Sequence, residues 1–381
     1  MVEVNPDRRV CIISSVEEPS LAGIAPIRDM VNLFTETHGH ITLVTSQRLV
    51  DAMAGSSDKL ECFVVNRYSN GQMPNRLVQY VLSQLRNAKV MLSVADRTDE
   101  WFFFVGGDTQ FIPAILAKLS GKPTHQMFGA ASKETMKTYG RGSGMLVPLL
   151  SFASKINCAL ATQIIVYSEH SLREYGLEAF RDKTVVNHRH VIDFERFRPY
   201  TPLNEREDVV AFMARLAHEK GILEFMDSLP ELLKNNADCK VRIYGTGSLE
   251  HEVAKRVREL DAGERVEFVG WIPHKDMPEH LNGIKLLVMP SYAEGLPNVM
   301  LEAMACGAAV LMNPVGAIPD VISDGDTGFL MDGNSPGTIS KRILEVLEDP
   351  TLKDVSLRGR ALVEEEFTFE RQVEKWRRLF Y

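Results

Sequence analysis

The chain has 381 residues, of which 45% are hydrophobic and 25% charged, a composition that excludes disordered, collagen-like and small disulfide-stapled proteins. The formal net charge of −8 lies in the second half, because residues 1–195 carry 20 basic and 20 acidic side chains whereas residues 196–381 carry 23 and 31. No broad basic stretch is present, which argues against a general nucleic-acid-binding protein. At about 100–200 residues per domain, this length predicts two domains.

The cysteines and the N-terminus indicate the compartment. The 5 cysteines are scattered and include no C-x-x-C pair, so we expect neither a disulfide framework nor a zinc ribbon, and a reducing environment is favoured. The first residues lack the apolar core of a secretory signal, and no apolar run approaches the roughly 20 residues of a membrane span. We therefore expect a cytoplasmic protein.

The first half alternates short apolar runs with helical spacing. Runs typical of strands occupy residues 10–14, 41–45, 102–105 and 164–167. Helical spacing occupies residues 27–37, 112–119 and 172–175, and a turn-rich stretch with Pro19 and Gly23 precedes the first of these helices. Strands that alternate with helices predict a parallel sheet covered on both faces.

The same pattern restarts after residue 195. Strands are expected at residues 209–213, 241–244, 266–269, 286–289 and 309–312, and helices at 223–233 and 250–260. Residues 199–202 (PYTP) read as the linker, and residues 369–381 read as one helix with Trp376 and Phe380 on the same face. Two α/β halves joined by a linker imply a cleft, and ligands of such sheets bind at the carboxyl ends of the strands.

Two glutamates follow the expected strand 286–289. Glu294 lies in the loop after this strand, and Glu302 lies in a helix that begins near Asn298. A helix N-terminus offers unpaired N–H groups and a partial positive charge, which suit a diphosphate. Glu302, just over one turn into the helix, can accept hydrogen bonds from two ribose hydroxyls. Taken alone, the two glutamates could equally be solvated surface charges.

Two cations follow the expected strand 209–213. Arg215 and Lys220 lie five positions apart, in a loop between a strand and a helix. Arginine offers a bidentate fork and lysine a point charge, so the two side chains can stabilise negative charge on a departing diphosphate. The alternative is an exposed surface pair without a role in binding.

A G-x-G sequence follows the expected strand 241–244 and suggests a dinucleotide fingerprint. Gly245 and Gly247 are present, but Glu250 occupies the position of the third glycine. Glu267, 20 residues after Gly247, lies inside an expected strand rather than at its end. An NAD-dependent oxidoreductase is therefore disfavoured.

Together these stretches resemble the retaining glycosyltransferases of family 4, also called group 1, which have the GT-B fold. Glu294 and Glu302 match the family's two glutamates with seven residues between them. The other similar stretches are residues 302–312 (EAMACGAAVLM), 316–320 (GAIPD), 324–330 (DGDTGFL) and 212–221 (FMARLAHEKG). Three positions depart from the family pattern, namely Ala214, Ala317 and Asp320.

The resemblance implies a GT-B architecture of two Rossmann-like α/β/α domains facing a central cleft. Residues 1–197 would bind the acceptor, residues 198–366 would bind the donor, and the C-terminal helix 367–381 would return to the first domain. The implied reaction transfers a hexosyl group from a UDP- or GDP-sugar to a hydroxyl of a glycan or lipid-linked acceptor, with retention, by a metal-independent front-face mechanism. The alternatives are a non-catalytic nucleotide-sugar-binding subunit of a glycosylation complex and a GT-B nucleotide-sugar epimerase.

The resemblance also assigns residues. Catalytic roles fall on Glu294, which contacts the donor sugar, and on Arg215 and Lys220, which stabilise the leaving diphosphate. Donor-binding roles fall on Gly23, Gly245, Ile272, Asn298, Met300, Leu301 and Glu302. In this group the Met300 and Leu301 amides face the phosphates, Ile272 reads the base and Glu302 holds the ribose. No metal and no cofactor is expected, and no residue is assigned to the acceptor.

Histidines leave two alternatives open. Many family members have a histidine at the end of the strand that follows a G-K-P turn, where this chain has Gly129, and the nearest histidine is His125. His188 and His190 form an i, i+2 pair that can chelate a metal, as do His38 and His40. No Cys or acidic ligand at the usual spacing accompanies either pair, which disfavours a metal site.

The segment 133–155 mixes basic and apolar side chains. Lys133, Lys137, Arg141 and Lys155 stand against Glu134 alone, a net charge of +3. Such a segment can dock on anionic lipid, which would make the protein peripheral on the inner membrane face. The alternative is a core-packed helix with a solvated basic face.

Overall fold

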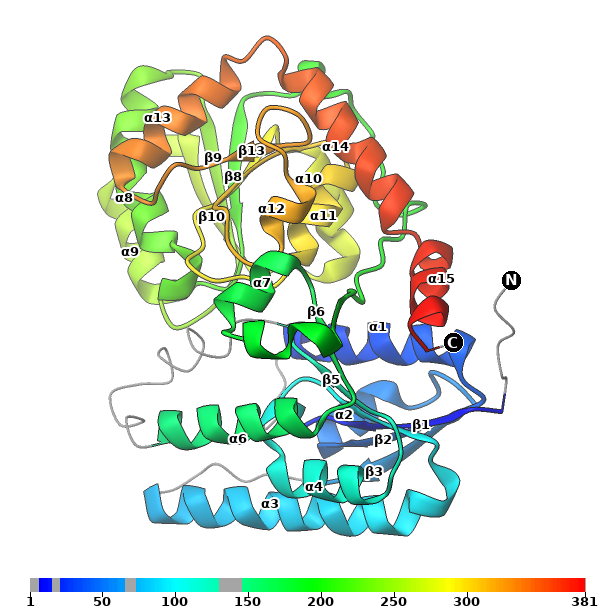
Figure 1. The fold of residues 1–381 in the computed structure, drawn as a ribbon. Coiled ribbons are helices and arrows are strands. Elements are labelled where there is room, and N and C mark those ends of the chain that lie inside the picture. Colours follow the sequence, from blue (N-terminus) through cyan, green and yellow to red (C-terminus); the bar gives the residue numbers. More distant parts are fainter. Residues whose placement is uncertain (1–6, 16–20, 66–72, 130–145, 381) are drawn as a thin grey trace. The chain divides into compact units, whose positions relative to one another are not determined.

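The computed structural model describes residues 7–15, 21–65, 73–129 and 146–380 (Figure 1). The chain divides into two compact units: one runs to Val191 and takes in the C-terminal helix from Phe369, and the other runs from Ile192 to Thr368. The expected boundary at residues 197 and 198 lies six residues later. The reason is that the chain already bonds within the second unit at Ile192, whose N–H donates to the carbonyl of Phe367 at 2.9 Å.

The first unit is built on a seven-stranded parallel sheet in the order β3-β2-β1-β4-β5-β6-β7. Its strands are β1 (Arg9–Ile13), β2 (His40–Thr45), β3 (Leu60–Val64), β4 (Glu100–Phe103), β5 (Thr124–Met127), β6 (Gln163–Val166) and β7 (Thr184–Val186). Its helices are α1 (Leu21–Thr37), α2 (Gln47–Met53), α3 (Met73–Val94), α4 (Phe111–Leu119), α6 (Leu146–Leu160), α7 (Glu169–Glu174) and α15 (Phe369–Phe380). The strand order reverses between β1 and β4, and ligands of such sheets bind at this point.

The second unit has a six-stranded sheet in the order β10-β9-β8-β11-β12-β13, also parallel. Its strands are β8 (Val209–Met213), β9 (Lys240–Tyr244), β10 (Val266–Gly270), β11 (Leu286–Met289), β12 (Ala309–Met312) and β13 (Phe329–Leu330). Its helices are α8 (Ile222–Asn235), α9 (Glu250–Glu259), α10 (Met277–Asn282), α11 (Asn298–Ala305), α12 (Ile318–Val321), α13 (Pro336–Leu347) and α14 (Leu352–Glu366). The expected α/β fold with two parallel-sheet units is confirmed.

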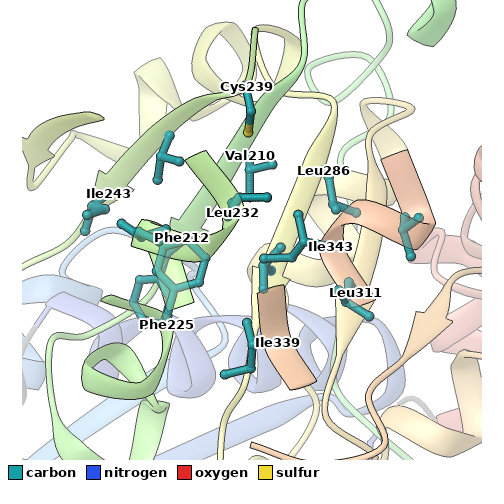
Figure 2. Close-up of a cluster of buried hydrophobic side chains, with 14 of the residues drawn as sticks. Val210, Phe212, Phe225, Leu232, Cys239, Ile243, Leu286, Leu311, Ile339 and Ile343 are labelled. Atoms are coloured by element: carbon teal, nitrogen blue, oxygen red, sulfur yellow. The ribbon is translucent and has the colours of Figure 1, made fainter. Parts of the chain in front are cut away.

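The core of the second unit lies between its sheet and the helices α8 and α13, which pack against each other. Figure 2 shows strand side chains meeting helix side chains there, all of them buried: Val210, Phe212, Ile243, Leu286, Leu311, Phe225, Leu232, Ile339 and Ile343. Burying one such side chain contributes about 1.5–3 kcal/mol. This packing makes the sheet a rigid base for the loops at its carboxyl edge.

Helix α1 begins six residues earlier than the expected helix at 27–37. Gly23 and Pro26 are typical of a turn, but both lie inside the helix. Ile24 and Ile27 are buried and continue the apolar face of the helix toward its N-terminus. Burial of this face outweighs the one backbone hydrogen bond that Pro26 removes.

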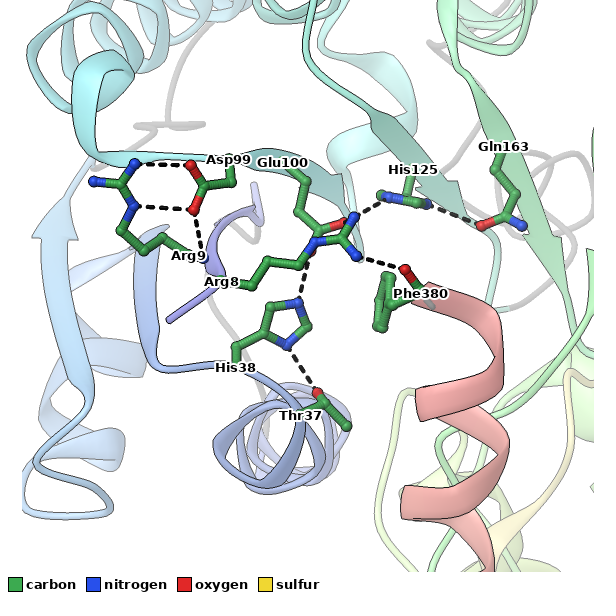
Figure 3. Close-up of polar contacts among 9 residues, drawn as sticks. All are labelled: Arg8, Arg9, Thr37, His38, Asp99, Glu100, His125, Gln163 and Phe380. Atoms are coloured by element: carbon green, nitrogen blue, oxygen red, sulfur yellow. Dashed lines mark hydrogen bonds and ion pairs between the residues drawn. The ribbon is translucent and has the colours of Figure 1, made fainter. Parts of the chain in front are cut away.

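A buried charge cluster lies at the start of β4 (Figure 3). The fully buried carboxylate of Glu100 lies 2.7 Å from His38 Nε2 and 2.9 Å from His125 Nε2, and Arg8 donates to it at 3.0 Å. Arg8 also donates to the backbone carbonyl of Phe380 in α15. His38 and His125, which are both buried, therefore contact a structural carboxylate.

Glu100 is the group whose charge holds this cluster together. Burial by itself would raise the pKa of its carboxyl, but hydrogen bonds from His125 and His38 outweigh burial and hold the pKa at about 2. Because this pKa lies below the unfolded value, the stabilisation is present above about pH 4.5 and is lost as the pH falls toward 2.

We expect Glu100→Gln to lower the free energy of unfolding by about 3 kcal/mol at pH 7, because Arg8 and two histidines lose their carboxylate. Urea unfolding of both proteins at pH 7 and pH 3.5 checks this, and the difference should narrow at the lower pH. The matched control is Glu61→Gln, which breaks an exposed ion pair with Arg97 and should change stability by less than about 1 kcal/mol. Equal effects of the two substitutions would contradict the proposed role of Glu100.

Within the described residues, no helix combines the length and the apolar character needed to cross a bilayer.

Candidate active site

Two expected catalytic residues meet at the carboxyl edge of the second sheet. Lys220 ends the short 3₁₀ helix His218–Lys220 after β8, and Glu294 lies in the loop after β11. Strands β8 and β11 are neighbours, so their loops emerge side by side. Lys220 Nζ lies 2.6 Å from Glu294 Oε1, and the two side chains are only 17% and 7% exposed. The pair is thus a nearly buried ion pair at the sheet edge.

The backbones of these two loops are in direct contact. Gly221 has φ +68°, and a Cβ on it would lie 2.1 Å from the carbonyl oxygen of Pro290. The N–H of Tyr292 donates to the carbonyl of Glu219 at 2.9 Å. Only glycine fits at position 221, since it needs both a left-handed conformation and the close approach of another backbone. These contacts set the spacing between Lys220 and Glu294.

Arg215 has a different environment from Lys220. Its side chain is 61% exposed, and its guanidinium bonds to Glu219 at 2.5 Å. In the described part of the chain it contacts neither Glu294 nor Glu302. Its exposed fork leaves donors available for an anion at the same edge of the sheet.

The N-terminus of α11 opens beside Glu294. Pro297 precedes the helix, and no side chain caps it. The first N–H groups of a helix lack intrahelical acceptors, so those of Asn298 to Met300 are available to a ligand. The Leu301 N–H already donates to the Pro297 carbonyl at 3.4 Å, which differs from its expected role toward a phosphate. The side chains of Met300 and Leu301 are fully buried and anchor the helix.

Glu302 has a partner that the sequence did not reveal. Its side chain is 8% exposed, and its Oε1 lies 2.7 Å from Nε2 of His274. His274 begins the 3₁₀ helix His274–Asp276, which leads directly into α10, and α10 packs against α11. The only sequence signal for His274 is its position just past Ile272, in the loop that follows β10.

Glycines bring the remaining loops together. Gly245, which directly follows β9, has φ +122°, and a Cβ there would lie 1.9 Å from the carbonyl oxygen of Ala214. Its N–H donates to the carbonyl of Gly270 at 2.8 Å. Gly245 therefore connects the loops that follow β8 and β10. Ile272, two residues after Gly270, is partly exposed. Glu267 pairs with Arg242 on β9 at 3.5 Å, as a side chain inside a strand can.

The first unit has a second set of special backbone positions, after β4. Val105 has φ +40°, an outlier for a β-branched residue, and Gly106 follows with φ +80°. Burial raises the pKa of the neighbouring Asp108 to about 6. Two glycines and an aspartate directly after an expected strand are the sequence signal for this turn. Gly23, by contrast, lies in the first turn of α1, and residues 17–20 before it lie outside the described residues.

The remaining sequence alternatives are only partly covered by the structure. Lys133, Lys137 and Arg141 lie outside the described residues, whereas Lys155 is exposed on α6 near Phe152, which is 63% exposed. The His188 and His190 rings lie 5.7 Å apart. Among the side chains that the structure describes, no three His, Cys, Asp or Glu residues cluster in a way that could hold a metal ion.

Known proteins have sequences similar to that of the second unit. Residues 193–361, which contain every site residue of the second unit, match the family model described as glycosyl transferases group 1. A GDP-mannose-dependent monoacylated alpha-(1-6)-phosphatidylinositol monomannoside mannosyltransferase of Corynebacterium glutamicum is 28% identical over 278 residues, covering 68% of this chain and 71% of that protein. The GDP-mannose-dependent alpha-(1-6)-phosphatidylinositol monomannoside mannosyltransferase of Mycolicibacterium smegmatis is 30% identical, over 42% of this chain and 46% of its own length.

The fold is also similar to that of solved structures. Anabaena HepE, determined in complex with UDP, superposes with a TM-score of 0.75 over 98% of this chain and 99% of that one, at 16% sequence identity. At this identity the similarity concerns the fold alone. The family model and the curated relatives agree, so residues 193–361 form a glycosyltransferase domain of group 1, and the two units have the GT-B fold.

Proposed function

We propose that the protein is a retaining glycosyltransferase that transfers a hexosyl group from a UDP- or GDP-sugar to a hydroxyl of a glycan or lipid-linked acceptor. The observation that carries the proposal is the nearly buried pair of Lys220 and Glu294, 2.6 Å apart beside the uncapped N-terminus of α11. A cation, a helix N-terminus and a carboxylate at one sheet edge suit a diphosphate joined to a sugar.

The donor would bind along this edge. The first N–H groups of α11, beginning at Asn298, and the Lys220 ammonium would face the diphosphate, with the exposed Arg215 as a third source of positive charge. Glu302 would accept hydrogen bonds from the ribose, and the backbone near Gly245 and Ile272 would lie beside the base. With three sources of positive charge in the chain itself, the reaction would need no divalent metal and no cofactor.

The chemistry would take place on one face of the sugar. The bond from the anomeric carbon to the phosphate oxygen breaks, and the acceptor oxygen forms its bond on the same face, which retains the anomeric configuration. The proton of the acceptor hydroxyl passes to the departing phosphate oxygen. Lys220 and the α11 N-terminus would stabilise the charge on the leaving diphosphate. Glu294, held by Lys220 through Oε1, suits orientation of the donor ring better than nucleophilic attack.

The relatives narrow the choice of substrates. Two mannosyltransferases with GDP-mannose donors and phosphatidylinositol-based acceptors support a GDP-sugar donor and a lipid-linked acceptor. A lipid-linked acceptor would fit peripheral contact with a membrane through residues 133–155, where Phe152 and Lys155 are exposed.

The decisive experiment is a thermal-shift titration with UDP, GDP, ADP and their sugar conjugates, with and without EDTA. A ligand that binds only the folded state raises the melting temperature according to its concentration and affinity. We expect one nucleotide to stabilise the protein selectively, without sensitivity to EDTA, and proton NMR of the transferred sugar to show retention. Absence of any nucleotide response, or an inverted product, would contradict the proposal. Conversion of the donor without an acceptor would instead favour an epimerase.

A further inference from the structure

Glu302 is a nearly buried carboxylate with one oxygen occupied and one open. Oε1 lies 2.7 Å from His274 Nε2, and Oε2 accepts no hydrogen bond from any residue that the structure describes. An ionised carboxylate can accept about four hydrogen bonds, so most of this capacity is unused. Burial of a carboxylate with so few partners is unfavourable unless a ligand completes its hydrogen bonds.

His274 is itself fixed in place from its other side. Arg196 donates to the backbone carbonyl of His274, and its second guanidinium nitrogen lies 3.4 Å from ring atom Nδ1. The ring of Phe197 lies 5.5 Å from the imidazole, centroid to centroid. The His274 side chain is 62% exposed, so these contacts, rather than burial, set its orientation.

These contacts also select a tautomer. A guanidinium can only donate, so Nδ1 of His274 accepts from Arg196. The ring proton therefore resides on Nε2 in the neutral imidazole and is donated to Glu302 Oε1. In this tautomer the imidazole can accept from Arg196 and donate to Glu302 at the same time.

We propose that His274 is a positioning residue for recognition of the donor ribose: its Nε2–H holds one oxygen of Glu302 so that the rest of the carboxylate is oriented toward the ribose hydroxyls. This inference rests on the proposed function, in which Glu302 binds the ribose. A free glutamate side chain loses rotamer freedom on binding a ligand, whereas one already held by His274 loses less, which strengthens binding.

A competing role for His274 would produce the same distance between its Nε2 and Oε1 of Glu302. If His274 occupied the place of a ribose hydroxyl in the empty site, the donor would have to displace it, and removal of the imidazole would tighten binding. The sign of the effect of one substitution therefore separates positioning from competition.

The experiment is isothermal titration of UDP and GDP, and of their 2′,3′-dideoxy analogues, into the full chain and its variants. We expect His274→Ala to weaken binding of the preferred nucleotide about ten-fold, the size of effect typical of a hydrogen bond to a charged group. His274→Gln, which retains an N–H donor, should restore most of the affinity. The dideoxy analogue should bind wild type and His274→Ala equally, because it has no hydroxyl for Glu302.

Two further variants make the result specific. In a Glu302→Ala background, His274→Ala should cause no additional loss, and in transfer assays His274→Ala should raise the donor KM with little change in kcat. The matched control is His280→Ala in the same unit, where the ring lies 3.3 Å from the Tyr244 hydroxyl, and it should leave nucleotide affinity unchanged.

Suppose that Glu302→Ala weakens nucleotide binding. The proposal for His274 is then overturned if His274→Ala binds the nucleotide as tightly as wild type or more tightly. It is also overturned if His274→Ala weakens binding of the dideoxy analogue as much as that of the nucleotide. If Glu302→Ala is without effect, or if neither nucleotide binds the wild type, the donor site itself is wrong, and the role of His274 fails with it.

Discussion

Lys220→Ala and Glu294→Ala should each lower the rate of sugar transfer by about 100- to 1,000-fold at saturating donor. Removing one fixed donor that stabilises developing negative charge has effects of this size in other enzymes. Lys220 lies at the sheet edge where the diphosphate would leave, and Glu294 is bonded to it at 2.6 Å. Steady-state kinetics with the donor identified by thermal shift checks this, with circular dichroism to confirm that each variant is folded.

The double variant distinguishes catalysis from structure. Each single substitution leaves one nearly buried charge without its partner, which destabilises the protein. The double substitution Lys220→Ala with Glu294→Ala removes both charges, so much of the lost stability should return. Transfer should not return, because in the proposed mechanism both groups act on the substrate. In the single variants, the melting temperature and the transfer rate should both fall. In the double variant, the melting temperature should recover while the transfer rate stays low.

A surface pair in the same unit serves as the control. Lys240 pairs with Glu207 at 2.8 Å, and both side chains are well exposed. Lys240→Ala removes the same charge from the same unit but should change neither rate nor melting temperature by much. Near-wild-type transfer by Lys220→Ala, or recovery of transfer in the double variant, would show that the pair only stabilises the fold.

The central strands of the second unit's sheet could be predicted from the sequence because they are buried on both faces. Strand β8 and strand β11 match the expected residues 209–213 and 286–289, both continuous apolar runs. Strand β5 was missed, since its residues 124–127 read THQM. His125 and Gln126 are nevertheless buried, His125 beside Glu100 in the charge cluster at the start of β4. Such a strand forms because it pairs with neighbouring strands from other parts of the chain, which its own residues do not indicate.

The site shows the same limit. Motif resemblance identified Lys220 and Glu294, but they are 74 residues apart, and their contact depends on β8 lying next to β11. No pattern in the sequence indicated that His274 would meet Glu302, because that contact depends on the packing of α10 against α11. Local motifs can therefore predict candidate site residues, whereas the contact partner of each residue depends on how distant elements pack.

Gly221→Ala should strongly damage the site, because Gly221 fixes the distance between the Lys220 and Glu294 loops. The added Cβ would lie 2.1 Å from the Pro290 carbonyl oxygen and 2.8 Å from its carbon, both backbone atoms. The loops would have to separate by about 1 Å, and a displacement of that size can lower a rate about 100-fold. The left-handed conformation at φ +68° adds about 1–2 kcal/mol for any residue with a Cβ.

Two other glycines separate the effect of the left-handed conformation from the effect of the steric clash with Pro290. Gly263 has φ +57° with no atom within 4 Å of a Cβ, so Gly263→Ala should show only the conformational loss of about 1–2 kcal/mol. Gly333 has open space around a Cβ and no left-handed φ, so Gly333→Ala should be close to neutral. We expect Gly221→Ala to lose more stability than Gly263→Ala and to lose transfer, which the other two retain. If Gly221→Ala instead matches Gly263→Ala in both melting temperature and rate, the two loops tolerate separation, and their contact does not set the geometry of the ion pair.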